Sequence, residues 1–274
     1  MAMTVVEVRR EAGVLFSLGW PSVVAKLLDF TPQTLLLWLV APLGPEAVAV
    51  AGMGSFWVNV TGQSIVAGFG IGMVPLASQA FGAKNYERMG ILLMRQQSIH
   101  LLLSVSVLFL WWHTEAALLF LQQPPTVAAG TAVFVRWRML ALPFLVINQN
   151  CVGFLQCQRV MKPQMVVGAL MCPIFVAMLW LMIEVLQLGT SGAAMALTIC
   201  DALRACFNTI AVTMKADKRT LPRYLSAEAL RQTFDVAGWW ELLKISMPGA
   251  LTVWSEVKCK PRGVSHHVCL GLHN

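Results

Sequence analysis

Long apolar stretches alternate with short polar ones along most of the chain. Six stretches approach the ~20 residues that a helix needs to cross a bilayer, and a seventh begins late. The second is long enough for a tilted helix, whereas the third is short, so its start is expected nearer Ile91. The pattern predicts an all-α, polytopic integral membrane protein. The stretches are residues 15–40, 47–80, 98–112, 139–155, 165–185, 192–214 and the incomplete 242–256.

Composition agrees with a membrane location. Hydrophobic residues make up 57% of the 274 residues, charged residues only 12%, and the mean hydropathy is +0.68. A soluble domain typically carries about 25% charged residues. The apolar excess therefore excludes an ordinary water-soluble domain, and the lipid bilayer is the first expected partner.

Lys and Arg residues concentrate in alternate connections between the apolar stretches. By the positive-inside rule, these connections and the N-terminus are predicted to be cytoplasmic. Arg136 and Arg138, near the outer end of the fourth stretch, are exceptions. The net charge of +7 is explained by the cytoplasmic segments, so no nucleic-acid partner is needed. Their basic residues are Arg9, Arg10, Lys84, Arg88, Arg95, Arg159, Lys162, Lys215, Lys218, Arg219, Arg223 and Arg231.

The pattern divides the chain into five segments. We expect no cleavable signal peptide, because the N-terminus is charged and lacks an apolar core. The multi-pass protein could lie in the plasma membrane or in an organelle membrane. The expected segments are a cytoplasmic N-terminus (1–11), a six-helix bundle (12–214), a basic cytoplasmic linker (215–241), the start of a seventh span (242–256) and a polar tail (257–274).

Ionisable residues inside the apolar stretches are the first candidates for function, because a charge in hydrocarbon costs several kcal/mol unless it is paired or hydrated. Lys26 and Asp29 are three residues apart, as are Asp201 and Arg204, so each pair can meet on one helical face. One interpretation is a self-neutralising structural pair. The other is a hydrated cavity in which a carboxylate binds a cation or a proton.

Motifs of enzymes and metal sites are missing from the sequence. There is no Ser/His/Asp arrangement, no phosphate-binding loop and no zinc-protease helix motif. The tail residues Cys259, His266, His267 and Cys269 only imitate a metal site. We therefore expect no enzyme activity, no bound metal and no cofactor.

Three motifs resemble the multidrug and toxic compound extrusion (MATE) family of transporters. Counted along the chain, the third of them, "LGTSGAAMA", is similar to the family's entry to helix six. The resemblance extends over roughly residues 12–256. The end of the second apolar stretch matches the family run S-Q-A-x-G-A-x-N through Ser78, Gln79, Ala80, Gly82, Ala83 and Asn85. The end of the fourth matches L-Q-x-Q-x4-P through Leu155, Gln156, Gln158 and Pro163.

The resemblance implies a secondary antiporter with twelve helices in two bundles. Such proteins export organic, often cationic, compounds in exchange for protons or sodium by alternating access. This chain would supply the first bundle and the start of helix seven, where Pro248 and Glu256 keep the spacing P-x7-E of the family. The resemblance implies a coupling role for Glu256. From the charges inside the apolar stretches we also expect Asp29 to take part in coupling, with Asp201 third. Many family members carry Asn or Asp in the fifth helix, but the corresponding stretch of this chain is apolar up to Glu184. Asp29 is included because it could take the place of those residues.

The family pattern stops after Glu256, and the polar tail that follows is interpreted as an unspliced intron or a frameshifted gene model. We expect a truncated form of the transporter. A single bundle would have to self-associate or pair with a second six-helix half to alternate access. The alternative is a non-transporting half that assembles with a full-length transporter or regulates it.

Overall fold

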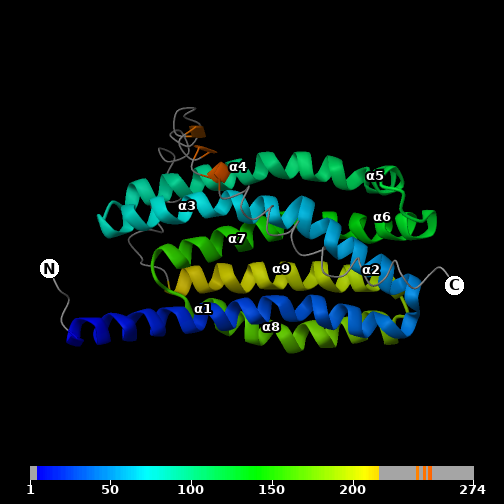
Figure 1. The fold of residues 1–274 in the computed structure, drawn as a ribbon, viewed down its shortest axis with the longest axis horizontal. Coiled ribbons are helices and arrows are strands. Elements are labelled where there is room, and N and C mark those ends of the chain that lie inside the picture. The colour runs from blue at the N-terminus through cyan, green and yellow to red at the C-terminus, as the bar shows by residue number, and fades with distance from the viewer. Residues whose placement is uncertain (1–4, 216–238, 241–242, 245, 249–274) are drawn as a thin grey trace.

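The computed structural model describes residues 5–215, 239–240, 243–244 and 246–248, and all of its regular elements are helical. The long helices run side by side along the longest axis (Figure 1). Three short elements join or extend them: η1 (Ala41–Leu43), the π-helix η2 (Asn59–Gln63) and the π-helix η3 (Leu181–Val185). The α-helices are α1 (Val5–Val40), α2 (Pro45–Val58), α3 (Ser64–Gly82), α4 (Tyr86–Trp112), α5 (Thr114–Phe120), α6 (Pro125–Met139), α7 (Leu142–Cys157), α8 (Lys162–Trp180) and α9 (Gly189–Lys215).

Five helical segments are long and apolar enough to cross a membrane. A sixth candidate is the pair α6 and α7, which is bent by 55°. The predicted all-α, polytopic bundle is therefore confirmed. The five segments are Gly19–Leu43, Pro45–Gly82, Tyr86–Trp112, Lys162–Val185 and Gly189–Lys215.

The connection between the second and third spans is shorter than the apolar pattern predicts. α4 begins at Tyr86, ahead of the expected start near Ile91, so Arg88 also lies on the helix and not in the connection. A polar helical turn outside the hydrocarbon gives no apolar signal, which is why the pattern missed it.

Asn85 explains why the first family motif ends as it does. Its backbone N–H donates to Ala80 O at 2.9 Å, which ends α3, while Lys84 adopts a left-handed φ of 57°. Its side chain then accepts a hydrogen bond of 3.0 Å from Arg88 N and caps α4. One residue thus ends one helix and begins the next.

Replacing Asn85 by alanine should therefore lower the free energy of unfolding by about 1 kcal/mol, the usual value of an N-cap. Thermal melting of the detergent-purified protein would measure the loss. Asn85→Asp keeps the cap and serves as the control. Equal melting of the alanine and aspartate variants would show that the cap contributes nothing.

The second family motif builds the equivalent turn between α7 and α8. Leu155 O accepts from Val160 N at 2.9 Å, and Gln156 O accepts from Arg159 N at 3.0 Å. Arg159 itself has a left-handed φ of 59°, which completes a Schellman-type helix end. Pro163 stands in the first turn of α8, where its missing N–H needs no partner.

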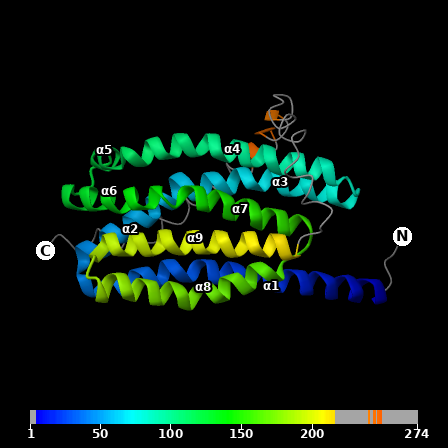
Figure 2. The same ribbon diagram turned by 180° about the vertical axis from the view of Figure 1, so that it is seen from behind.

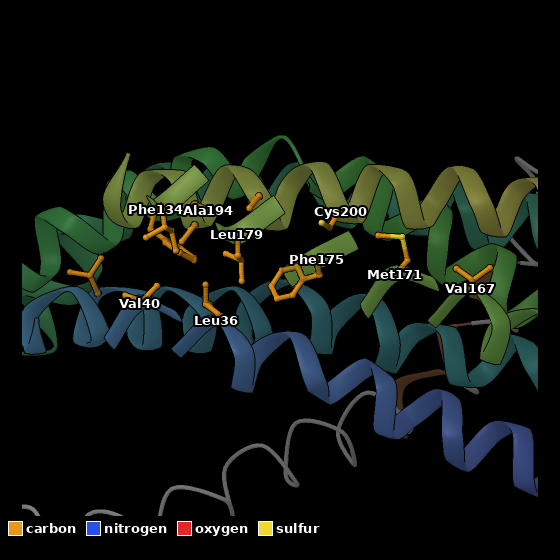
Figure 3. Close-up of a cluster of buried hydrophobic side chains, with 14 residues drawn as sticks. Leu36, Val40, Phe134, Val167, Met171, Phe175, Leu179, Ala194 and Cys200 are labelled. Carbon is orange, nitrogen blue, oxygen red and sulfur yellow. The ribbon is translucent and has the colours of Figure 1, made fainter. Parts of the chain in front are cut away.

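Small residues let α9 approach its neighbours closely, and they include the third family motif. Ala193 and Ala194 are fully buried, and a Cβ on Gly192 would lie 2.8 Å from Met182 O. Close helix contact through small side chains is a common means of packing in membranes. The resulting apolar core joins α1, α8 and α9 (Figure 3), with Leu36 of α1 and Leu179 of α8 among its buried members.

Candidate functional site

A cavity of about 90 Å³ lies inside the bundle, walled by α1, α2 with η2, α6, α7, α8 and α9. Its apolar wall includes residues of the core described above, such as Leu36 and Phe175. Its other wall is unusually polar for the interior of a membrane bundle. The polar lining residues are Asp29, Gln33, Ser55, Asn59, Gln63, Arg138, Asp201 and Arg204.

Two ion pairs dominate this cavity, and each joins two different spans. Arg204 Nη1 donates to Asp29 Oδ1 at 2.8 Å, which links α9 to α1. Arg138 Nη1 lies 2.6 Å from Asp201 Oδ2, which links α6 to α9. Two carboxylates and two guanidiniums thus compensate one another within one small space.

The predicted pairing of Asp201 with Arg204 is wrong. Spacing along a helix allows that contact, but each side chain instead meets a partner on a neighbouring helix. The predicted Lys26–Asp29 contact exists, although it is long, at 3.9 Å, and Lys26 is 68% exposed. The structure therefore brings Asp29 and Asp201, two of the three predicted coupling carboxylates, to the same cavity.

The role of Arg138, which lies near the outer end of the fourth apolar stretch, was not predicted from the sequence. The bend between α6 and α7 carries this arginine into the bundle, where its side chain is only 7% exposed. Pro143 stands in the first turn of α7 and prevents a continuous helix. Thr198 Oγ1 lies 3.1 Å from Trp137 O and holds the end of α6 against α9. The available signal in the sequence was an arginine at the edge of an apolar stretch that contains Pro143.

The π-helix η2 forms part of the polar wall of the cavity. Single π-turns inside α-helices occur frequently at functional sites. Here the turn begins at Asn59 and ends at Gln63, and both residues line the cavity. Trp111 of α4 holds the turn in place, since its Nε1 donates a hydrogen bond to Thr61 Oγ1 at 2.8 Å. Gly62 lies against the same indole, where a Cβ would be 2.4 Å from Trp111 Cζ2.

One hydroxyl group in the cavity wall is buried without a partner. Ser55 Oγ has no hydrogen-bond partner among the residues that the structure describes. Together with the carboxylates and the Asn59 and Gln63 side chains, it adds an oxygen to the lining. Oxygen ligands of this kind suit a hard cation.

The residues of the first two family motifs do not line the cavity. Glu256 lies outside the described residues. The first two family motifs form the α3–α4 and α7–α8 connections at one end of the bundle (Figure 2), so in the described part of the chain they shape helix ends. Within the described ranges, no group of three His, Cys, Asp or Glu side chains could hold a metal ion.

The spans and the charged cavity define a multi-pass membrane protein with a polar site in one helical bundle. A model of the MatE family matches residues 21–181, more than half of the chain, and the chain therefore belongs to this family of transporters and not to a family of enzymes. It is 34% identical over 192 residues to multidrug and toxin extrusion protein 2 of Mus musculus, covering 70% of this chain and 34% of the relative. An uncharacterized transporter of Schizosaccharomyces pombe is 29% identical over 251 residues, covering 90% of this chain and 45% of the relative.

Structural similarity supports the same fold. The crystal structure of the eukaryotic MATE transporter AtDTX14 superposes with a TM-score of 0.81 at 22% identity. The match covers 90% of this chain and 54% of that one. The chain thus spans about half the length of this solved relative, and a third to a half of the two curated ones.

Proposed function

We propose that this bundle binds the coupling ion of a secondary antiporter that exports small organic, mainly cationic, compounds in exchange for protons or sodium. One observation carries the proposal: Asp29 and Asp201 share a cavity with two arginines, in a chain of a transporter family. Asp29 is the better candidate, because its side chain is 32% exposed against 21% for Asp201. The coupling ion therefore has easier access to Asp29.

Competition for the Asp29 carboxylate supplies the mechanism. Arg204 donates to Asp29 Oδ1 at 2.8 Å, so an arriving cation competes with the guanidinium for this carboxylate. A displaced Arg204 carries an uncompensated charge inside the bundle, which is unfavourable unless the helices move to give it a new partner. Ion binding at Asp29 is thereby linked to a movement of α9 against α1.

Alternating access requires a second bundle that moves against this one. We propose that the six-helix bundle acts with such a half, either in a longer form of the protein or by association of chains. The relatives' greater length supports this proposal. Glu256 would contribute to coupling from helix seven, with the N-terminus on the cytoplasmic side.

Replacing Asp29 by asparagine tests the proposal directly. In proteoliposomes containing the purified chain, efflux of a fluorescent organic cation should follow an imposed proton or sodium gradient. Asp29→Asn should reduce the gradient-driven rate by about tenfold or more, because the amide cannot exchange a proton or attract a cation. Glu184→Gln, which changes an exposed carboxylate on η3, should retain the wild-type rate.

Three results would count against this function. Efflux that is independent of both gradients would rule out antiport. Equal coupling in Asp29→Asn and wild type would rule out a role for Asp29 in coupling. Binding of the organic cation without efflux would favour a half that assembles with or regulates a full-length transporter.

A further inference from the structure

A second and larger cavity opens on the outside of the bundle, away from the charged one. It has a volume of about 680 Å³ and lies between α8 and α9, beside Pro21 of α1. α8 begins and α9 ends at the same end of the bundle (Figure 2). We call this cavity the α8–α9 groove. Its lining residues are Pro21, Arg159, Val160, Met161, Lys162, Pro163, Val166, Val167, Leu170, Phe207, Ile210, Ala211, Met214 and Lys215.

The walls of the groove are apolar and open to the surroundings. Val166 and Leu170 on α8 are 58% and 46% exposed, and Ile210 and Met214 on α9 are 51% and 70% exposed. In a bilayer, such surfaces face lipid acyl chains. The walls therefore fit a hydrocarbon chain lying along the two helices.

The mouth of the groove is basic. Arg159, Lys162 and Lys215 line it, and none of the fourteen lining residues is acidic. None of the three has an ion-pair partner among the residues that the structure describes. An anion at this mouth would thus meet three positive charges that no described residue neutralises. Basic pockets between transmembrane helices are known to bind phospholipid head groups.

The backbone at Arg159 is left-handed, as it is at Lys84, Gln122 and Gln187. Its φ of 59° places it in the left-handed region at a helix end where glycine is the common residue. A positively charged, bulky residue is held there although glycine would relieve the backbone. Arginine at this position places a guanidinium at the mouth of the groove.

We propose that the α8–α9 groove is a binding site for an anionic glycerophospholipid. Its acyl chain lies between α8 and α9, and its phosphate contacts Arg159, Lys162 and Lys215. The site is separate from the charged cavity and does not depend on transport.

Lipid retention by the purified chain tests this assignment. Native mass spectrometry in neutral detergent would compare phosphatidylglycerol with phosphatidylcholine of the same acyl chains. Wild type should retain phosphatidylglycerol at least tenfold more strongly. Arg159→Gly should weaken that binding about fivefold, as expected for one interfacial charge, without loss of thermal stability because glycine suits the backbone.

Two further variants separate the groove from general surface charge. Lys84→Gly removes a lysine from a left-handed helix end outside the groove and should leave phosphatidylglycerol binding unchanged. Ala211→Phe fills the groove with all charges intact and should weaken binding at least fivefold.

Several outcomes would overturn the proposal. Equal retention of the two lipids would mean unspecific contact, and equal loss in Lys84→Gly and Arg159→Gly would mean general attraction. Full competition by inorganic phosphate would mean a site for free anions. Unchanged binding in Ala211→Phe would place the lipid outside the groove. No lipid binding by a stably folded wild type would mean that another protein segment covers this face.

Discussion

Replacing Arg138 by glutamine is expected to lower the free energy of unfolding by about 3–5 kcal/mol, the usual effect of breaking a buried ion pair from one side. The change leaves Asp201 charged in the bundle without the guanidinium that lies 2.6 Å from it. Unfolding by sodium dodecyl sulfate in mixed micelles would measure the loss. The size of the effect follows from the burial of Arg138, whose side chain is 7% exposed.

A double variant shows whether the loss comes from the pair. Arg138→Gln combined with Asp201→Asn removes both charges. The loss of stability in the double variant should be about 2 kcal/mol smaller than the sum of the losses in the two single variants. Lys26→Gln is the control for an exposed pair and should change stability by less than about 0.5 kcal/mol. Additive losses in the double variant would show that Arg138 stabilises the bundle through packing and not through Asp201.

Gly62→Val is expected to destabilise the bundle by about 3 kcal/mol, the upper end for an overpacked core. The Cβ of the new valine would overlap Trp111 Cζ2. The indole cannot move away without breaking its hydrogen bond to Thr61. The same unfolding assay would record the loss. Ion coupling should weaken as well, because η2 carries Asn59 and Gln63 in the cavity wall.

Gly19→Val is the matched control, since a Cβ on Gly19 would meet no atom within 4 Å. It should change stability by less than about 1 kcal/mol. Trp111→Leu in the Gly62→Val background should recover part of the loss, because it clears the space. If Gly62→Val and Gly19→Val were equally stable, the contact with Trp111 would not constrain the π-helix.

The fold could be predicted from the sequence because span length and hydrophobicity are local properties of the chain. The apolar run from Met165 onward, for example, is long enough by itself to indicate a span. Helix ends were harder to predict. Asn85 looked like part of a loop, whereas its side chain caps a polar turn that no hydropathy pattern reveals.

The site could be predicted only in part, since it depends on contacts between helices. Asp29 and Asp201 stood out as charges in apolar surroundings, and the structure places both at one cavity. Their arginine partners could not be assigned, because spacing along one helix says nothing about a neighbouring helix. Arg138 was missed for the same reason. Its contact with Asp201 depends on the bend between α6 and α7, which the sequence alone does not reveal.

The central claim is that an ion replaces Arg204 at Asp29, and infrared difference spectroscopy of the reconstituted chain tests it most directly. Acidification or addition of sodium should change a carboxylate band in wild type and in Glu184→Gln. The same band should be absent from the difference spectrum of Asp29→Asn. An identical spectrum in Asp29→Asn and wild type would contradict the claim, because the responding carboxylate would then lie elsewhere.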